Sequence, residues 1–207
     1  MLNVIKMFMI MFTICACSTL VGREEVVQHK LDETVRQIYM YKKGLFQGRA
    51  TAFILTYSMR TYIITNRHVC ERADLLMLGP VPLTTMIVSY DTDLCAIPTI
   101  PTTPSLLLAD LMVPNGTKVY SLGYGGGVYK QKTGTIKGAE RTLGYVGDST
   151  SINLKIIPGD SGSPVVNEEG KVLGVIAERS LNGPDTAYMV SHTNLKSFLD
   201  FIVKVGL

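Results

Sequence analysis

The chain has 207 residues, of which 46% are hydrophobic and 18% are charged. This balance is typical of a globular protein and excludes a disordered chain. The formal net charge is only +3, and the basic residues form neither a run nor a stripe interleaved with aromatic residues, so charge gives no support for nucleic-acid binding. A chain of this length suits one large domain or two small halves that pack closely together.

The first residues differ from the rest of the chain, because a single early lysine precedes an apolar run and a small-residue segment, MLNVIKMFMIMFTICAC. This order is typical of a secretory signal peptide, and the run is shorter than the roughly 20 residues that span a bilayer. Its end, ICAC, resembles a bacterial lipobox, in which the last cysteine is lipidated. We therefore expect a signal peptide over residues 1–16, lipidation of Cys17, and a periplasmic or cell-surface protein held to a membrane by acyl chains. An ordinary signal peptide cut nearby and a short uncleaved anchor are the alternatives.

Residues 17–34 form a polar lead-in, in which Val27, Leu31 and Val35 have the spacing of a short helix. From residue 35 onward the chain changes to about a dozen short segments rich in Val, Ile, Thr and Tyr, separated by Gly, Pro, Asn and Asp. Because no long helical pattern separates these segments, they predict an all-β fold, either a sandwich or a set of barrels.

The prolines of residues 98–112 forbid a continuous central strand, so we expect a linker there. It would join a first β-rich half, about residues 35–98, to a second, about residues 113–207. The chain ends in HTNLKSFLDFIVKV, whose apolar residues have helical spacing and whose Thr193 or Asn194 can cap the helix. This segment predicts a C-terminal amphipathic helix.

The segment PGDSGSP, residues 158–164, places a serine on a tight glycine-rich turn. Gly159 and Gly162 allow backbone angles closed to other residues, so the amides of Gly159 and Ser161 can point at one spot and hold an oxyanion. A serine hydroxyl becomes a good nucleophile only when a neighbouring base takes its proton. A glycine-rich hairpin without function would have the same local sequence.

The chain has three histidines, and only one lies where a base would be useful. His29 lies in the lead-in and His192 begins the C-terminal helix, whereas His68 ends an apolar strand in TYIITNRHVCERAD. Asp93 precedes the apolar run LCAI, so its carboxylate begins a buried strand and needs a partner, which a histidine N–H would supply. Asp91 fits better as a turn residue that caps its own backbone.

Cleavage before Cys17 would leave Cys70 and Cys95 in the folded part, without the CxxC spacing of a zinc or redox site. An oxidising compartment would permit a disulfide between them, and two buried thiols are an equal alternative. The sequence predicts neither a metal nor a cofactor.

The three segments TNRHV, TDLCA and PGDSGSP, in this chain order, resemble the trypsin- or chymotrypsin-fold serine proteases, and most closely the HtrA-like (Deg) branch. GRATAFIL, VYSLGYGGG, KTGTIKG and EEGKVLGVIAE resemble further segments of that family, so the likeness covers roughly residues 35–205. It implies a trypsin-like peptidase domain over residues 35–207, with two antiparallel six-stranded β-barrels and an active site between them.

The resemblance implies a serine endopeptidase that cleaves proteins or peptides. In it His68 is the general base, Asp93 orients the base, Ser161 is the nucleophile, and the amides of Gly159 and Ser161 form the oxyanion hole. Residues 175–178 would pair with an extended substrate. The substrate-binding residues that we expect lie before the serine and on this strand: Ile156, Ile157, Ile176, Ala177 and Glu178. We favour an apolar side-chain pocket floored by Ile156 or Ile176, and Lys155 would favour acidic side chains if it lay inside that pocket.

Three departures from the family pattern matter. Asp160 stands where the HtrA-like branch usually has Asn, and in digestive proteases a new N-terminus binds this aspartate after zymogen cleavage. No activation motif is visible, so we expect Asp160 to be exposed or paired with a local cation such as Arg179. No sequence follows Leu207 for a PDZ domain. Cys70 and Cys95 each lie two residues after a predicted catalytic residue, so a disulfide would brace the base against its orienting acid.

Two other functions deserve comparison. Ser161, Asp185 and His192 follow the chain order of α/β-hydrolases, but residue 163 is Ser where the nucleophile elbow needs Gly, and alternating strands and helices are absent. A binding or adhesion lipoprotein on an inactive protease scaffold is the non-enzymatic alternative. The filled triad and oxyanion positions argue against it.

Overall fold

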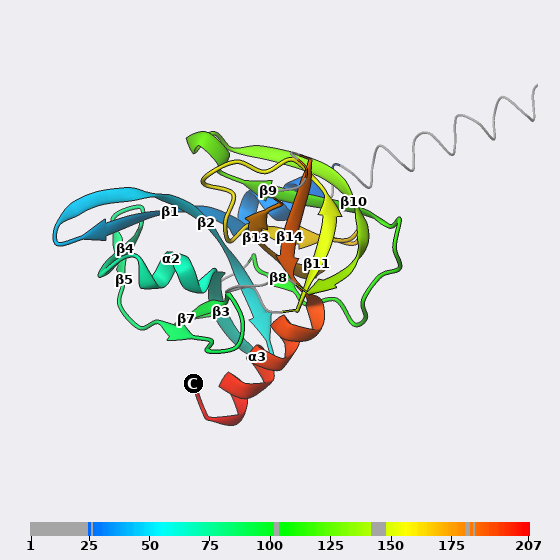
Figure 1. The fold of residues 1–207 in the computed structure, drawn as a ribbon. Helices are drawn as coiled ribbons and strands as arrows, with labels where there is room; N and C mark the ends of the chain where they lie inside the picture. Colours follow the sequence, from blue (N-terminus) through cyan, green and yellow to red (C-terminus); the bar gives the residue numbers. More distant parts are fainter. Residues whose placement is uncertain (1–24, 26, 102–103, 142–147, 181–182, 184) are drawn as a thin grey trace, which may run out of the picture.

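The computed structural model describes residues 25, 27–101, 104–141, 148–180, 183 and 185–207, so the predicted signal peptide and Cys17 lie outside the described residues. The described chain folds into two β-rich halves followed by a C-terminal helix (Figure 1). Within this part of the chain, no helix has both the length and the hydropathy required to cross a bilayer.

The first half is a curled, open sheet of eight strands with the hydrogen-bonded order β5-β4-β1-β2-β3-β7-β6, and β8 is added in parallel beside β2. A short helix, α2 (Arg67–Glu71), follows β3. The strands are β1 (Val35–Lys42), β2 (Leu45–Tyr57), β3 (Arg60–Thr65), β4 (Leu75–Leu78), β5 (Val81–Leu83), β6 (Ile87–Val88), β7 (Cys95–Thr99) and β8 (Leu106–Leu107).

The second half is a closed barrel with the strand order β10-β11-β14-β13-β12-β9. It leads into helix α3 (His192–Lys204) and contains the short 3₁₀ helix η1 (Gly125–Gly127). Its strands are β9 (Lys118–Gly123), β10 (Lys130–Arg141), β11 (Asp148–Asn153), β12 (Pro164–Val166), β13 (Val172–Arg179) and β14 (Thr186–Val190).

The predicted all-β class, with a six-stranded second barrel and a C-terminal helix, is confirmed. The first half differs in detail, because its edge strands β5 and β6 have only three and two residues and do not pair with each other. Such short edge strands leave few backbone groups for closure, so this half curls without closing.

The largest hydrophobic cluster joins the two halves to each other. It contains Phe53 and Ile64 of the first sheet, Leu122 and Val175 of the barrel, and Leu199 of α3, all fully buried. Each such side chain contributes roughly 1.5–3 kcal/mol to folding. Separate clusters fill the first sheet and the barrel interior. The shared cluster fixes the two halves relative to each other, and therefore also the residues that face each other between them.

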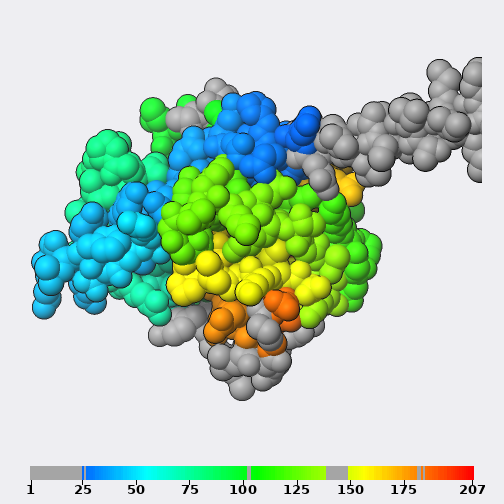
Figure 2. All heavy atoms as spheres, turned by 90° about the horizontal axis from the view of Figure 1, so that it is seen from above, coloured from blue at the N-terminus to red at the C-terminus, as the bar shows by residue number. Residues whose placement is uncertain are grey.

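The predicted lead-in is helical over residues 27–34, and Val27 and Leu31 enter the shared cluster. Figure 2 shows the blue N-terminal residues lying against the green strands of the second half. The Tyr129 hydroxyl donates to the Asp32 carboxylate at 2.5 Å, and Lys30 Nζ donates to the Glu169 carbonyl at 2.7 Å. These contacts tie the lead-in to the barrel.

Helix α3 buries the apolar stripe that its spacing predicts: Leu195, Phe198, Leu199 and Ile202. Its cap differs from the prediction, because Ser191 is the N-cap residue and its Oγ accepts from the Asn194 amide at 3.3 Å. Thr193 and Asn194 lie inside the first turn, where they cannot act as the cap.

Candidate active site

The first sheet supplies a partly exposed histidine paired with a buried carboxylate. β3 ends at Thr65, and α2 carries His68 in its first turn. The Asp93 carboxylate accepts the His68 backbone amide at 2.9 Å and contacts the ring Nδ1 at 2.7 Å. Asp93 is 1% exposed, and Asn66 Nδ2 donates to its carbonyl at 3.0 Å. An ionised carboxylate only accepts hydrogen bonds, so the neutral imidazole tautomer that fits this contact has its proton on Nδ1 and a lone pair on Nε2.

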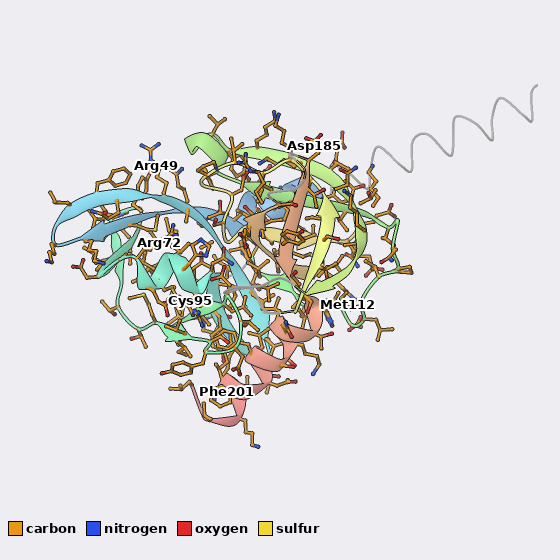
Figure 3. All side chains as sticks on the ribbon, in the orientation of Figure 1. Arg49, Arg72, Cys95, Met112, Asp185 and Phe201 are labelled. Atoms are coloured by element: carbon orange, nitrogen blue, oxygen red, sulfur yellow. A yellow bond between two sulfur atoms is a disulfide. The ribbon has the colours of Figure 1, made fainter. Side chains whose placement is uncertain are left out.

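A disulfide lies directly behind this pair. Cys70 of α2 and Cys95 of β7 are bonded, with a Cα–Cα distance of 6.6 Å (Figure 3, where Cys95 is labelled). Each cysteine follows its active-site neighbour, His68 or Asp93, by two residues. The bond therefore joins the helix that carries the imidazole to the strand that follows the carboxylate.

The second half supplies Ser161 on a turn that requires its glycines. Gly159 has a φ of 103°, and a Cβ there would come within 2.5 Å of the Tyr124 carbonyl. Thr51 of β2 supports the turn, because its Oγ1 donates to the Gly159 carbonyl at 2.8 Å and its amide donates to the Ser161 carbonyl at 2.9 Å. Burial raises the pKa of the Tyr124 phenol, so this neighbour is uncharged at neutral pH.

Two amides of the turn are left free. The amides of Asp160, Gly162 and Ser163 donate to backbone carbonyls. The Pro158 carbonyl accepts from the Gly126 amide at 2.8 Å, and in a planar trans peptide this directs the Gly159 amide to the opposite side. Within the described part of the chain, the amides of Gly159 and Ser161 donate to no other atom. They are therefore available for an external oxyanion.

Of the two expectations for Asp160, exposure is wrong and pairing with a cation is confirmed, but the cation is not Arg179. Asp160 is 2% exposed, and its carboxylate accepts the Gly125 amide at 3.1 Å and the Ile157 amide at 2.8 Å. Its cation is Lys132 of β10, whose Nζ contacts the same carboxylate. Arg179 lies at the exposed end of β13.

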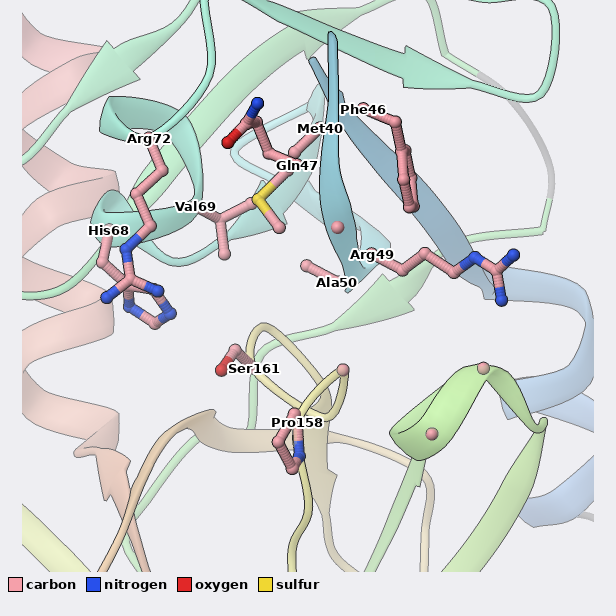
Figure 4. A pocket seen from close by; sticks show the side chains of 14 residues that line it. Met40, Phe46, Gln47, Arg49, Ala50, His68, Val69, Arg72, Pro158 and Ser161 are labelled. Atoms are coloured by element: carbon pink, nitrogen blue, oxygen red, sulfur yellow. The ribbon is translucent and has the colours of Figure 1, made fainter. Parts of the chain in front are cut away.

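An open pocket of about 580 Å³ contains both His68 and Ser161. Figure 4 shows His68 and Arg72 on one side of it, Arg49 on the other and Ser161 between them. The lining residues come from both halves: Met40, Phe46, Gln47, Gly48, Arg49, Ala50, His68, Val69, Arg72, Gly126, Gly127, Pro158, Gly159 and Ser161. Lys155 is exposed and lies outside this lining.

None of the five predicted substrate-binding residues lines this pocket. Ile156 and Ile176 are 5% and 0% exposed and pack in the barrel core, so the prediction that either floors an open pocket needs correction. Ile176 lies on β13, where alternate strand residues form the barrel interior, whereas Ile156 enters the same cluster from the segment between β11 and the serine turn. Ala177 is buried in the shared cluster, whereas Ile157 and Glu178 are exposed beside the turn and on β13.

The other two histidines lie elsewhere. The His29 side chain is 73% exposed and faces Glu33 on the helical lead-in. His192 is buried, and its Nε2 lies 2.7 Å from the Ala109 carbonyl. The all-β fold and this engagement of His192 exclude the α/β-hydrolase alternative.

Residues 50–175 match the family described as a trypsin-like peptidase domain, which is more than half of the chain. The chain belongs to the trypsin-like peptidase family. Two curated relatives from strains of Mycobacterium tuberculosis, named serine protease MT3772 and serine protease Rv3671c, are each 28% identical over 145 residues. The match covers 62% of this chain and 36% of each relative, so the chain spans little more than a third of their length.

Solved structures of trypsin-like peptidases share the fold. The active form of the Rv3671c protease has a TM-score of 0.70 at 24% identity, covering 84% of this chain and 82% of that one. A variant of the HtrA-type protease AlgW with a tripeptide has a TM-score of 0.72 at 20% identity, covering 87% and 64%. The family resemblance seen in the three motifs is confirmed.

Sequence reasoning missed several residues that shape the site. Asn66 and Thr51 lie inside the motifs TNRHV and GRATAFIL, so the family resemblance could have indicated both positions. Arg49, Arg72 and Lys132 also lie inside quoted segments, GRATAFIL, TYIITNRHVCERAD and KTGTIKG, but only the folded arrangement brings them to the site.

Proposed function

We propose that this chain is a serine endopeptidase that hydrolyses peptide bonds in proteins or peptides through an acyl-enzyme. Ser161 is the nucleophile, His68 the general base, and Asp93 the residue that orients the base. One observation carries the proposal: the imidazole held by Asp93 at 2.7 Å lines the same pocket as Ser161.

In the acylation step, Ser161 Oγ attacks the carbonyl carbon of the substrate while its proton passes to His68 Nε2. Asp93 stabilises the imidazolium that forms, through the contact at Nδ1. The amides of Gly159 and Ser161 hold the negative oxygen of the tetrahedral intermediate. The carbon–nitrogen bond then breaks, and the proton on Nε2 passes to the leaving amine.

In the deacylation step, water takes the place of the amine. His68 removes one proton from it as the hydroxyl attacks the ester carbon, and the same two amides hold the new oxyanion. When the ester bond breaks, Ser161 Oγ receives the proton from His68, and the carboxylic acid product leaves. The chain returns to its starting state with one peptide bond hydrolysed.

The acyl half of the substrate is proposed to lie along β13. β12 pairs with β13 only as far as Val175, so residues 177–179 have no strand partner on that side among the described strands. An extended peptide can add there by backbone hydrogen bonds, with its carbonyl carbon directed to Ser161.

The leaving half of the substrate must then continue to the opposite side of Ser161, into the pocket that Arg49 and Arg72 line. No carboxylate lines this pocket within the described part of the chain. We propose a preference for acidic side chains after the cleaved bond. Both arginines are exposed, so each is worth at most about 1 kcal/mol, or roughly fivefold in rate.

A peptide library that varies the three residues after the cleaved bond tests this preference. We expect Glu and Asp to be favoured over Gln and Asn, and Arg49→Gln and Arg72→Gln to reduce the difference. Equal cleavage of acidic and amide peptides would contradict the preference while leaving the endopeptidase proposal intact.

Export with a lipid anchor at Cys17 is also proposed, on the signal-like first residues. The Cys70–Cys95 disulfide supports export, because such bonds persist mainly in oxidising compartments. Cys17→Ser should move the protein from the membrane fraction to the soluble fraction. Unchanged partitioning would refute the lipid anchor.

Hydrolysis of an unfolded protein substrate tests the proposed activity. The wild-type chain should cleave it and Ser161→Ala should not. Ser163→Ala is the matched control, because Ser163 lies in the same turn and its buried Oγ has no hydrogen-bond partner in the described structure. A folded wild-type chain that cleaves no peptide bond, or cleavage retained by Ser161→Ala, would favour the inactive-scaffold alternative.

A further inference from the structure

We infer that Lys132 is a positioning residue. Its ammonium neutralises the Asp160 carboxylate, and this contact holds the serine turn with the amides of Gly159 and Ser161 free. The turn takes this form without prior cleavage of the chain. This inference rests on the proposed function, and it assigns a task to Lys132, the first residue of the segment KTGTIKG on β10.

The ion pair between Asp160 and Lys132 is largely buried. The side chains of Asp160 and Lys132 are 2% and 17% exposed, and the ammonium contacts carboxylate Oδ2. A carboxylate removed from water needs both a counter-charge and hydrogen-bond donors. Asp160 has both, because two backbone amides also donate to it.

The two amides that donate to Asp160 lie on both sides of the serine turn. One belongs to Gly125, the first residue of η1, and the other to Ile157, directly before the turn. The next residue of η1, Gly126, donates to the Pro158 carbonyl at 2.8 Å, and this contact directs the Gly159 amide to the side opposite that carbonyl. The carboxylate therefore connects both sides of the peptide that forms half of the oxyanion hole.

Steric fit supports the same connection. A Cβ on Gly125 would come within 2.7 Å of both Asp160 carboxylate oxygens, and a Cβ on Gly123 within 2.7 Å of one of them. Any side chain at either position would push against the carboxylate. The glycines of the VYSLGYGGG segment thus leave the room that this buried carboxylate occupies.

Strand pairing in the barrel brings the Lys132 ammonium to Asp160. Lys132 lies on β10 opposite Ser121 of β9, and Ser121 in turn lies opposite Val165 of β12, the strand that follows the turn. Closure of the barrel therefore brings the ammonium to the carboxylate as the chain folds. The counter-ion of this aspartate is thus a side chain of the barrel itself.

Four variants test the role of Lys132, with peptide hydrolysis measured as kcat and KM separately. Lys132→Met removes the charge and keeps most of the volume, and Lys132→Arg restores a cation. Lys132→Met combined with Asp160→Asn removes both charges. Lys130→Met is the matched control, because Lys130 lies on the same strand and is exposed.

We expect Lys132→Met to lower kcat on the order of 100-fold, the loss typical of one oxyanion donor, with KM changed much less. Lys132→Arg and the double variant should each have a kcat at least tenfold higher than that of Lys132→Met. Lys130→Met should match the wild type. A folded Lys132→Met with kcat near wild type, or a double variant no faster than Lys132→Met, would overturn the inference.

If Lys132→Met does not fold, the double variant decides, because it lacks the unpaired buried carboxylate. A folded double variant within about tenfold of the wild-type rate supports the inference. An unfolded or inactive double variant contradicts it. If the wild-type chain itself is inactive, the proposed function fails first, so the two failures are distinguishable.

A separate measurement tests whether the chain is active without prior cleavage. Intact-mass analysis of wild-type chains that carry a fluorophosphonate adduct should show residues 25–207 uncut. Adducts found only on chains cut within this range would overturn this part of the inference.

Discussion

The two halves of the molecule hold their active-site groups by different means. The first sheet holds His68 through the Asp93 carboxylate and a disulfide just behind it. The barrel holds Ser161 through a buried ion pair between Asp160 and Lys132 and through backbone bonds from Thr51. A covalent bond lies beside the proposed base, and an ionic and hydrogen-bonded network holds the turn of the proposed nucleophile.

The difference follows from what each half must present. The first half presents a single side chain, His68, and two contacts to the Asp93 carboxylate are enough to set its orientation and tautomer. The barrel presents a hydroxyl and two backbone amides, so its whole turn must be held. An open sheet with short edge strands gains most from a cross-link, whereas a closed barrel already fixes its strands.

The largest expected effect comes from removing the base. His68→Ala should lower kcat on the order of 10⁶-fold, because the nucleophile then has no proton acceptor. His29→Ala is the control, since its ring is exposed on the lead-in. Peptide hydrolysis by the two purified variants gives the comparison. Activity kept by His68→Ala in a folded protein would remove the first sheet from the mechanism.

Asp93→Asn should have the next largest effect, a loss of kcat on the order of 10⁴-fold. The asparagine keeps the shape but its NH₂ group would favour the wrong imidazole tautomer. Asp91→Asn, at an exposed position two residues earlier, should behave as the wild type. Equal rates for the two variants would show that the contact at Nδ1 has no role in orienting the base.

Removing the disulfide should cost stability more than activity. Cys70→Ser with Cys95→Ser opens a loop of 25 residues, and we expect the free energy of unfolding to fall by about 3 kcal/mol. Because both contacts between Asp93 and His68 remain, kcat should fall by less than about tenfold. Urea unfolding and peptide hydrolysis of the double variant measure the two quantities. A large loss of kcat with unchanged stability would reverse the roles we assign to the disulfide and the carboxylate.

The smallest expected effect concerns a contact far from the site. Asp200 of α3 contacts Lys196 and Tyr57, and hydrogen bonds from these two groups lower the pKa of its carboxyl. Stability from this contact is therefore present above the ordinary carboxyl pKa and is lost as the pH falls through the lowered value. Because the group is exposed, Asp200→Asn should cost only about 0.5 kcal/mol at neutral pH and nothing in strong acid. Thermal unfolding against pH checks this, and a cost that grows toward low pH would contradict the assigned sign.

The sequence predicted those parts of the site that lie in short segments. His68, Asp93 and Ser161 each lie at a junction next to an apolar strand, and such junctions are visible in local patterns. The all-β class followed from the same short segments. The cap of α3 was predicted two or three residues too late, because Ser191, Thr193 and Asn194 can all cap a helix and local sequence does not fix the first turn.

The partner of Asp160 could not be predicted in this way. Lys132 precedes it by 28 residues, and only the register of β10 on β9 brings the two together. Arg179 looked closer in sequence but lies at an exposed strand end. The same reasoning applies to the core position of Ile176, because barrel closure decided which face of β13 points inward.

In the proposed mechanism, a base from one half of the molecule activates the serine of the other half. Mapping of a fluorophosphonate adduct by mass spectrometry, on the wild-type chain and on His68→Ala, tests it most directly. We predict one adduct per wild-type chain on the peptide that contains Ser161, and almost none on His68→Ala over the same time. An adduct elsewhere, a folded wild-type chain without adduct, or equal labelling of both proteins would contradict the account.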